Sequence, residues 1–419
     1  MKRIRIAVVG AGIAGLAIAL GCERGGHEVT LFEATSSVGG RMETVEHEGH
    51  PLDIGFHVLH TAYPTVQRWI DLKQLNVKAM DNCTVTIHPA SGRRRLLGDA
   101  LRAPRYLLPT VKSVGIGDGL RFLKWKLSTS SRDLERGLDT PTRSISTTLQ
   151  ERRFRPSTRR VLETLFTGIT LDPSLSERFA FADFTWGAMA HGSMVVPQQG
   201  IGAVPKQLAA QLSPASLRLG AAVTGVTAKS VSLDGEQLDF DRVVLAVPQH
   251  VATQLLPSMQ PEHQPTERLT STVVFKASRP PFRRARLLLN ESWGQNGNTV
   301  LHVHIPTNLH PHPRGEHWVV ATLVGEDALQ PDVEQVRAEL KAWFGAEVEQ
   351  WEFSTTTTVR HALPHIDPEH HARAYEEVDV EGVLLAGDHR THPSVQGALA
   401  SAEQILKHLG VPLPSEVNA

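Results

Sequence analysis

The chain has 419 residues, a length that predicts two domains with a sizeable buried core. Its formal net charge of −1 gives no reason to expect nucleic acid as a partner, and 41% apolar with 21% charged residues is ordinary for a globular enzyme. The two cysteines, Cys22 and Cys83, cannot form a disulfide framework, and no run of about 18 apolar residues is present to span a membrane. We therefore expect a cytoplasmic protein. The basic start of the chain is followed by regularly spaced glycines, which argues against a signal peptide.

The first forty residues carry the strongest motif. An apolar run over 4–9 predicts a buried parallel strand, a helical pattern begins at Leu16, and a second strand over 29–32 ends at Glu33. The first strand and the helix are joined by a G-x-G-x-x-G turn: Gly10, Gly12 and Gly15. In such a turn the glycines permit a tight bend, close approach of a pyrophosphate and close helix–strand packing, and the acid accepts from ribose hydroxyls. The order of these features predicts a Rossmann-like dinucleotide-binding unit.

A second glycine motif indicates that the dinucleotide is FAD rather than NAD. Gly39, Gly40 and Arg41 follow Glu33 and form a turn that could approach a diphosphate with a cation, which nicotinamide dehydrogenases do not need. The two motifs in this order resemble the flavin amine oxidase superfamily, which includes phytoene desaturases and protoporphyrinogen oxidases. The resemblance implies non-covalently bound FAD, with Gly40 and Arg41 among the residues that contact it.

The C-terminal part of the sequence resembles the second flavin motif of the same superfamily. An apolar strand ends in Gly387 and Asp388, and a helical run follows over 399–409. The resemblance implies that Asp388 binds the ribityl and pyrophosphate portion of the cofactor. It also places backbone from Val395 to Gly397 against the pyrimidine edge of the flavin, where a helix N-terminus could stabilise negative charge.

The middle of the sequence returns the chain to the cofactor domain. Residues 217–223, 226–233 and 241–248 predict strands, and the resemblance places backbone at Val223 against the adenine. We expect an α/β fold, in which a discontinuous Rossmann-like FAD/NAD(P)-binding domain is combined with an α+β substrate-binding domain. The expected boundaries are 1–85, 190–265 and 370–419 for the FAD-binding domain, and 86–189 and 266–369 for the substrate domain.

Motifs on the substrate side favour the phytoene desaturase branch of the superfamily. Gly55, His57 and the Ala-Tyr-Pro over 62–64 resemble that branch, as do motifs spread over the rest of the chain. The resemblance places Gly55 and His57 near the flavin. His57 is the candidate catalytic residue, because a histidine with its usual pKa near 6.5 could orient substrate or transfer a proton. A role in packing alone is the alternative. Gly200 and Gly202 permit a tight loop close to the flavin, although a plain turn explains them equally well.

The segment over 270–282 argues against amine oxidation. Amine oxidases of the superfamily often place a lysine early in this segment, where it hydrogen-bonds a water beside the flavin. Lys276 is the only lysine of the segment, and if the family position falls at Val273, the odd offset points Lys276 to the other face of the strand. The sequence also offers no recognisable pair of aromatic residues for an amine-binding cage.

The 21 histidines do not form a metal motif. His302 and His304 alternate on a predicted strand and therefore share a face, and further histidines follow them in the sequence. No HExxH, CxxC or carboxylate at ligand spacing accompanies them, so we expect no metal site.

A basic stretch over 93–126 contains nine Lys and Arg and two Asp, interleaved with leucine and aromatic residues. Such a run is usually a solvated face, but it is also typical of a peripheral membrane contact. A membrane contact would suit a lipophilic substrate.

We expect an FAD-dependent oxidoreductase that removes hydride from an organic, lipophilic substrate in the manner of a carotenoid or phytoene desaturase. Oxidation of an amine or a porphyrinogen is the alternative among oxidoreductases. An isomerase that retains its flavin, or a binding protein with little turnover, is the alternative from another class.

Overall fold

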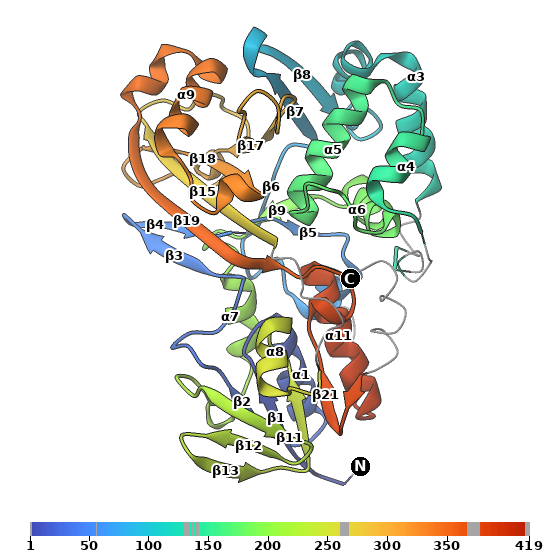
Figure 1. The fold of residues 1–419 in the computed structure, drawn as a ribbon, viewed down its shortest axis with the longest axis vertical. Coiled ribbons are helices and arrows are strands. Elements are labelled where there is room, and N and C mark those ends of the chain that lie inside the picture. Colours follow the sequence, from blue (N-terminus) through green and yellow to red (C-terminus); the bar gives the residue numbers. More distant parts are fainter. Residues whose placement is uncertain are drawn as a thin grey trace.

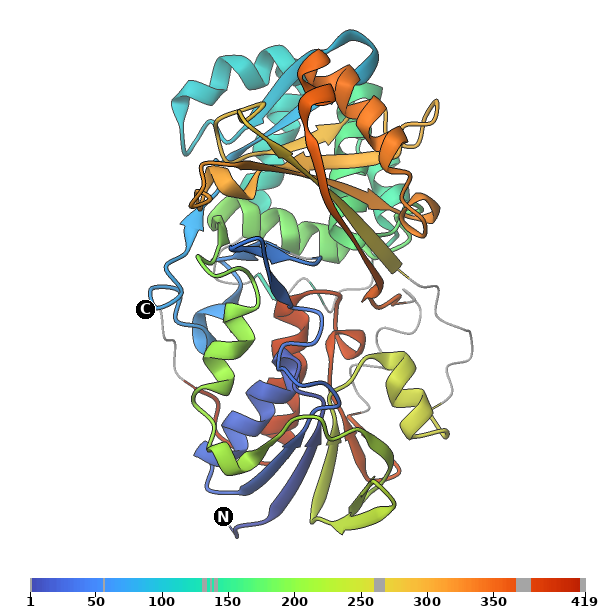
Figure 2. The ribbon, with the colours of Figure 1, turned by 90° about the vertical axis from the view of Figure 1, so that its left-hand side faces the viewer.

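The computed structural model describes residues 2–55, 57–129, 134–135, 138, 142–259, 268–366 and 378–414. These residues form two parts that lie end to end along the long axis of the molecule (Figures 1 and 2). A six-stranded sheet organises the part that contains the N-terminus, and a seven-stranded sheet organises the other part.

The six-stranded sheet has the first strand of the chain near its centre, in the order β10-β2-β1-β14-β21-β20. All neighbouring strands are parallel except β20 and β21. The strands are β1 (Arg5–Val9), β2 (Glu28–Phe32), β10 (Leu217–Arg218), β14 (Arg242–Leu245), β20 (Asp379–Val380) and β21 (Val383–Leu385). Parallel strands joined by helices make this part an α/β Rossmann-like fold, as the sequence predicts.

Two helices cover one face of this sheet, α1 (Ile13–Arg24) and α11 (Val395–His408), and they pack against each other. Gly21 permits their close approach, because a Cβ atom there would lie 2.6 Å from Leu406 Cδ1. The same part contains the short helices α2 (Pro64–Trp69), α7 (Ala203–Ala209) and α8 (Gln249–Leu255).

The other face of the six-stranded sheet is covered by a small antiparallel sheet. Its strands are β11 (Val223–Thr227), β12 (Ser230–Leu233) and β13 (Glu236–Asp239). The prediction of single strands over 217–223 and 226–233 is therefore wrong. The first is interrupted because Gly220 turns the chain at φ +67°, and the second is divided by the turn between β11 and β12.

The seven-stranded sheet is mixed, with the order β19-β15-β18-β17-β16-β7-β8. Neighbours are antiparallel except β16 and β7. The strands are β7 (Cys83–His88), β8 (Arg93–Gly98), β15 (Arg268–Ala277), β16 (Leu287–Asn290), β17 (Val300–His304), β18 (His317–Val324) and β19 (Glu352–Leu363). Because β7 belongs to this sheet, the boundary expected at residue 85 falls inside a strand.

Helices lie on both sides of the seven-stranded sheet (Figure 1). The amphipathic α9 (Val333–Phe344) packs its apolar residues against one face. The remaining helices group on the other side: α3 (Leu107–Ser128), α4 (Ile145–Glu151), α5 (Pro156–Thr170) and α6 (Phe179–His191). Within the described ranges, no helix has the length and apolar character needed to cross a membrane.

Two small sheets lie where the two parts meet. One pairs β3 (Thr44–His47) with β4 (His50–Asp53), and the other has the order β5-β9-β6. The strands of the second sheet are β5 (Leu59–His60), β6 (Lys78–Ala79) and β9 (Met194–Val196). Leu52 of β4 packs against Trp318 and other residues of the seven-stranded sheet, so β4 carries the chain from one part to the other. The segment after β4 is therefore held at the junction.

Candidate active site

The three glycines of the first turn meet different requirements. A Cβ atom at Gly10 would lie 2.7 Å from the carbonyl oxygen of Ala246, and one at Gly15 would lie 1.9 Å from the carbonyl oxygen of Gly10. A Cβ atom at Gly12 would meet nothing within 4 Å. Packing inside the chain therefore excludes side chains at Gly10 and Gly15, whereas the space in front of Gly12 is available to a bound group.

The same turn leaves the start of α1 ready for an anion. Gly12 is the N-cap residue, no side chain caps the helix by a hydrogen bond, and its first turn contains no acidic residue. The first residues, Ile13 and Ala14, are nevertheless buried. A buried helix N-terminus normally finds partners for its free N–H groups, and a phosphate is a suitable partner. This donor set fits the pyrophosphate of a dinucleotide.

Glu33 directly follows β2, and its carboxylate points toward the glycine turn over 10–15. One oxygen accepts a hydrogen bond from Ala11 N at 2.8 Å, and the other accepts from Thr35 N and Oγ1 at 3.0 and 2.9 Å. The carbonyl of Glu33 accepts from Ala221 N at 2.8 Å, two residues before Val223. The structure thus brings the expected ribose and adenine positions to the same edge of the sheet.

The second glycine pair packs directly on the first turn. Gly39 forms a parallel bridge with Gly12, and Gly39 N donates to the carbonyl of Ala11 at 2.9 Å. Gly40 has a φ of +56°, and a Cβ atom there would lie 3.5 Å from Gly12 Cα. The two glycine motifs predicted from the sequence therefore form one backbone surface.

Arg41 and Asp388, from motifs 347 residues apart, form an ion pair with 2.5 Å between Nη2 and Oδ1. Arg41 also donates to the carbonyl of Ala362 at 3.0 Å. Burial alone would lower the pKa of Arg41, but the adjacent Asp388 carboxylate outweighs it and the pKa is raised. Arg41 therefore stays cationic beside the glycine surface.

The C-terminal motif is held by its own backbone contacts. Gly387 has a φ of +137°, and a Cβ atom there would lie 2.7 Å from the ring of His389. Helix α11 begins at Val395, four residues before the predicted helical run, and Ser394 caps it by accepting from Gly397 N at 3.0 Å. This helix start is therefore partly satisfied by the chain itself, unlike the start of α1.

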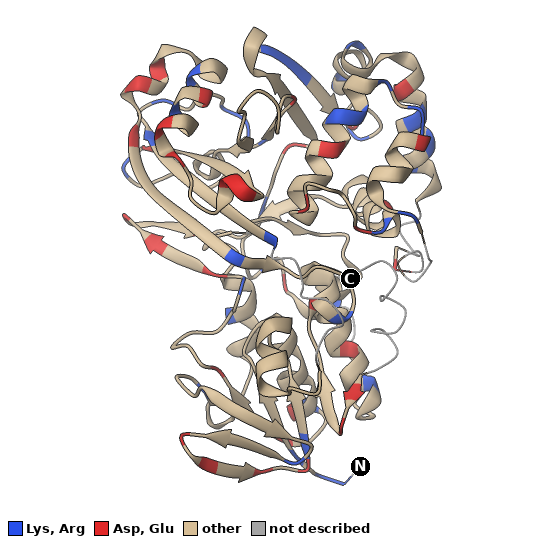
Figure 3. Ribbon diagram, in the orientation of Figure 1, with Lys and Arg blue, Asp and Glu red and all other residues tan. Residues whose placement is uncertain are grey.

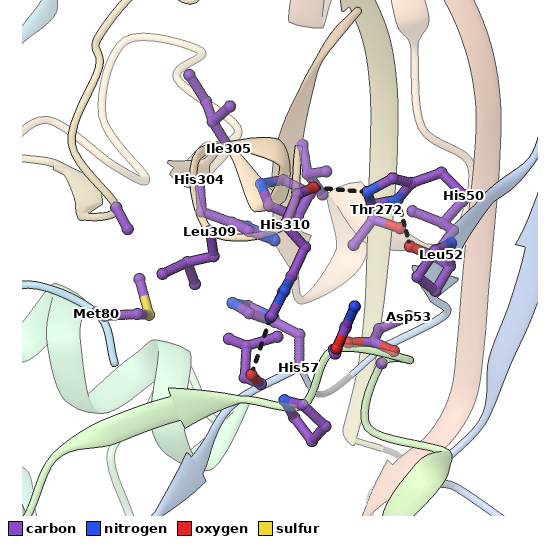
Figure 4. A pocket seen from close by; sticks show the side chains of 18 of the residues that line it. His50, Leu52, Asp53, His57, Met80, Thr272, His304, Ile305, Leu309 and His310 are labelled. Carbon is purple, nitrogen blue, oxygen red and sulfur yellow. Dashed lines mark hydrogen bonds between the residues drawn. The ribbon is translucent and has the colours of Figure 1, made fainter. Parts of the chain in front are cut away.

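A cavity lies at the junction of the two parts, beside the segment after β4 (Figure 4). Gly55 and Gly200 both line it. Gly200 has a φ of +77°, and a Cβ atom there would lie 2.4 Å from Thr44 Cγ2. Strand β19 lies beside both Gly55 and the loop of Arg41, because a Cβ atom at Gly55 would lie 3.4 Å from Val359 Cγ2 and Arg41 donates to the carbonyl of Ala362. One strand therefore joins the segment that lines the cavity to the loop expected to contact the cofactor.

Asp53 is a half-buried carboxyl group in the cavity wall. Its Oδ1 accepts from Thr44 Oγ1 at 2.5 Å and from Ile201 N at 2.9 Å. Burial raises the pKa of Asp53 to about 7, against the lowering effect of these two hydrogen bonds. Asp53 thus holds the loop that contains Gly200 and can change its charge near neutral pH.

His57 lies in the cavity wall and stacks on His304, with ring centroids 3.8 Å apart and planes 4° apart. Burial lowers the pKa of His57 to about 4, and a hydrogen bond with the backbone of Gly55 only partly opposes this. His57 is therefore neutral at physiological pH. Its titration lies below the range that its usual value of 6.5 suggests.

Strand β15 contributes a residue to the cavity wall. Thr272 lines the cavity, while Val273 is packed in the core on the opposite face. Lys276 therefore points to the face opposite Val273, as expected, and this is the face on which Thr272 lines the cavity. Lys276 lies four residues further along the strand, where Glu48 and Glu352 each hold its Nζ at 2.9 Å.

Sequence reasoning missed Asp53, Thr272 and the role of His304 as a wall of the cavity. Asp53 precedes Gly55 by two residues, so its position near the motif was the only available signal. His304 was identified only as a neighbour of His302 on one strand face, which the structure confirms. Among the described residues, no group of three or more His, Cys, Asp or Glu is arranged to hold a metal ion.

The sequence matches the family of flavin containing amine oxidoreductases over residues 13–405. The chain belongs to this family. Members of a flavin-containing family carry the cofactor that the glycine turns fit, and the chain is an FAD-dependent oxidoreductase.

Other similarities of the chain to known proteins are partial or distant. It is 43% identical over 61 residues to the zeta-carotene desaturase of Synechocystis sp., a match that covers 14% of this chain and 12% of that enzyme. The fold is similar to that of an oxidoreductase from Methanosarcina mazei, with a TM-score of 0.72, 16% identity and coverage of 96% and 100%. It is also similar to that of a putrescine oxidase bound to putrescine, with a TM-score of 0.71, 18% identity and coverage of 98% and 100%.

Proposed function

We propose that this protein removes hydride from a lipophilic organic substrate, in a dehydrogenation of a carbon–carbon bond like that of carotenoid desaturases. The observation that carries the proposal is the wall of the cavity. Apolar side chains form much of it: Leu52, Met80, Val196, Ile305, Leu309 and Val320. No Phe, Tyr or Trp among the described residues lines it, so the described part of the wall offers no aromatic cage for an amine. The partial match to a desaturase supports the same choice.

FAD supplies the hydride acceptor when it is bound. The chain binds and orients it through the surface described above. The residues proposed to contact it are Gly10, Gly12, Gly15, Glu33, Gly40, Arg41, Gly55, Val223, Gly387, Asp388, Val395 and Gly397. Their backbone N–H groups, one arginine and one carboxylate at the ribose are suited to a dinucleotide without a covalent bond.

His57 is the proposed catalytic residue. Because it is neutral at physiological pH, it can orient the substrate by hydrogen bonding or accept a proton, but it does not serve as a charged acid. The apolar wall excludes water from the reacting carbon.

The test is anaerobic mixing of the purified holoprotein with phytoene, ζ-carotene and a set of primary amines, while the flavin absorption is followed. The proposal predicts that a polyene bleaches the flavin and that the amines do not. Bleaching by an amine or a porphyrinogen alone would contradict it, and no bleaching by any compound would favour an isomerase or a binding protein.

We propose that the protein takes its lipophilic substrate from a membrane surface, and that it contacts this surface through α3. Most of the exposed large apolar side chains in the described residues lie over 101–127. Ile116, Leu120, Leu123 and Leu127 recur at helical spacing, so they form one exposed stripe. Exposed Lys112 and Lys124 lie on the same helix, and basic residues also mark β8 (Figure 3). Apolar and basic side chains together suit the surface of an anionic bilayer.

Sedimentation with lipid vesicles tests this contact. We expect binding to vesicles that contain phosphatidylserine and weaker binding to phosphatidylcholine alone. The double substitution Leu120→Glu with Leu127→Glu should abolish it. Leu219→Glu, at an exposed leucine of the other part, is the matched control and should bind normally. Failure of the unaltered protein to bind either vesicle would refute the contact.

A further inference from the structure

Two side chains in the cavity wall have polar atoms without a hydrogen-bond partner. Thr272 on β15 and His304 on β17 line the cavity and are 3% and 7% exposed (Figure 4). Thr272 Oγ1 and His304 Nδ1 are both buried, and neither forms a hydrogen bond with any residue that the structure describes. Buried polar groups are nearly always hydrogen-bonded, and the exceptions call for an explanation such as a ligand or water. The two atoms therefore indicate where a polar group of a ligand belongs.

Their positions in the sheet bring them to one face. Thr272 pairs with Thr322 of β18, and Thr322 pairs with His302 of β17, two residues before His304. Both ring nitrogens of His302 are also buried without a partner in the described chain. The unpartnered atoms thus lie on one face of the sheet, in a cavity wall that combines apolar side chains with polar ones such as Asp53 and Arg286.

The protonation state of this patch limits the ligands that it suits. Burial lowers the pKa of His304 well below 6.5, and the neighbouring His57 and His302 lower it further. The neutral imidazole offers one N–H donor and one acceptor nitrogen, and the threonine hydroxyl both donates and accepts. A neutral oxygen group complements this pair better than a fixed charge does.

We infer that the substrate carries a hydroxyl or carbonyl oxygen, which binds among the unpartnered polar atoms of Thr272 and His304 in the cavity wall. The inference rests on the proposed function and specifies its substrate class: an oxygenated lipophile is bound in preference to a hydrocarbon of the same skeleton, which can still react. The apolar walls hold the carbon skeleton, and the polar pair fixes its position along the cavity. A hydrocarbon would leave both polar atoms buried and unpaired, which is the basis of discrimination.

The experiment compares two probes with the same carbon skeleton, farnesol and farnesene. Each is titrated into the oxidised holoprotein, and binding is read from the perturbation of the flavin absorption spectrum. We expect farnesol to bind at least about tenfold more tightly, because one buried hydrogen bond to a neutral group accounts for a difference of this order.

Variants assign the preference to the two side chains. Thr272→Val removes the hydroxyl with little change of shape, and His304→Phe keeps a ring that can stack on His57. Each should bring the ratio of the two affinities close to one. Thr270→Val is the matched control, because Thr270 lies on the same face of β15, is 6% exposed and donates to the carbonyl of Leu323 at 2.9 Å. It should keep the preference.

Equal binding of the two probes to the unaltered protein would overturn the inference, as would a preference that survives in Thr272→Val. A shift of the flavin spectrum in Thr272→Val without any probe, with the preference unchanged, would overturn it by assigning the hydroxyl to the flavin. Anaerobic bleaching is recorded separately in the same mixtures. A preference for farnesol without bleaching by any organic compound supports the inference and contradicts the proposed function alone.

Discussion

The surface proposed for the dinucleotide, which the glycine turns and the start of α1 form, differs from the cavity in the groups that it presents. The dinucleotide surface consists of backbone: glycine turns, a free helix start and the end of β2, all within short segments of the chain. The cavity consists of side chains from β4, β15 and β17, which are far apart in the sequence and meet only in the fold. A site made of backbone requires glycines at fixed spacing, whereas a site made of side chains can change its chemistry by single substitutions. This contrast explains how one family can retain its cofactor and vary its substrate.

Asp53, in the cavity wall, should give the largest effect, because burial raises the pKa of its carboxyl group in the folded protein. Its unfolded-state pKa is near 3.9 and its folded value is about 7, so the folded state holds the proton more tightly. Stability from this group is complete below pH 4 and is lost as the pH rises to about 7, at up to about 1.4 kcal/mol per pH unit. Asp53→Asn should therefore become progressively more stable than the unaltered protein over this range.

Thermal unfolding of the two proteins between pH 4 and 8 measures this difference. Asp332→Asn, which alters the exposed N-cap of α9, is the control and should show no such trend. If the melting temperatures of Asp53→Asn and the unaltered protein depend on pH in the same way, the raised pKa of Asp53 is contradicted.

Gly12 tests the backbone surface without disturbing the fold. Gly12→Ala adds a Cβ atom that meets nothing in the protein but enters the space proposed for the pyrophosphate. We expect a normal melting temperature for the apoprotein and roughly a hundredfold weaker FAD binding, or about 2.7 kcal/mol, by titration. Gly15→Ala, whose Cβ atom would collide with Gly10, should not fold. Equal FAD affinity in Gly12→Ala and the unaltered protein would show that the pyrophosphate lies elsewhere.

Glu33→Ala should weaken FAD binding by about ten- to a hundredfold, because a charge-assisted hydrogen bond contributes roughly 1.5–3 kcal/mol. The chain should still fold, with a slightly lower melting temperature from the lost bonds to Ala11 and Thr35. Thr35→Val removes the hydroxyl that bonds Glu33 but keeps the carboxylate, so its FAD affinity should stay near normal. Titration of the apoprotein with FAD measures these affinities. An unchanged dissociation constant in Glu33→Ala would refute the ribose contact.

His57→Gln should lower the rate of flavin reduction by at least about tenfold while FAD content and melting temperature are kept. Because burial lowers the pKa of His57 to about 4, the loss should be the same at pH 6 and pH 8. His60→Gln is the control, since His60 is also buried with its pKa lowered to about 4 but does not line the cavity. If stopped-flow rates of His57→Gln and the unaltered protein agree, His57 has only a packing role.

The glycine motifs could be found in the sequence because their geometry requires particular residue types. Only glycine fits at Gly10 and Gly15, and the acid at Glu33 follows from the end of a strand. The fold class and the family followed from these motifs. The ion pair between Arg41 and Asp388 joins two predicted motifs, although their direct contact could not be foreseen from either one.

The cavity could not be predicted in the same way. A strand places alternate residues on opposite faces, so a shift of one position reverses the face: Thr272 lines the cavity, whereas Val273 lies in the core. Burial and stacking set the protonation of His57 and His304, and neither is visible before the strands are paired. The strand boundaries near Val223 also depended on a glycine turn that the apolar pattern concealed.

The most direct test of the central claim is the identity of the cofactor in the purified protein. The structure and the family require a yellow protein that releases one equivalent of FAD per chain when it is denatured by acid or heat. The released flavin is measured by its absorption and by chromatography against FAD, FMN and NADP. Recovery of FAD in the supernatant is the predicted result. Recovery of bound NADP with no flavin would contradict the account.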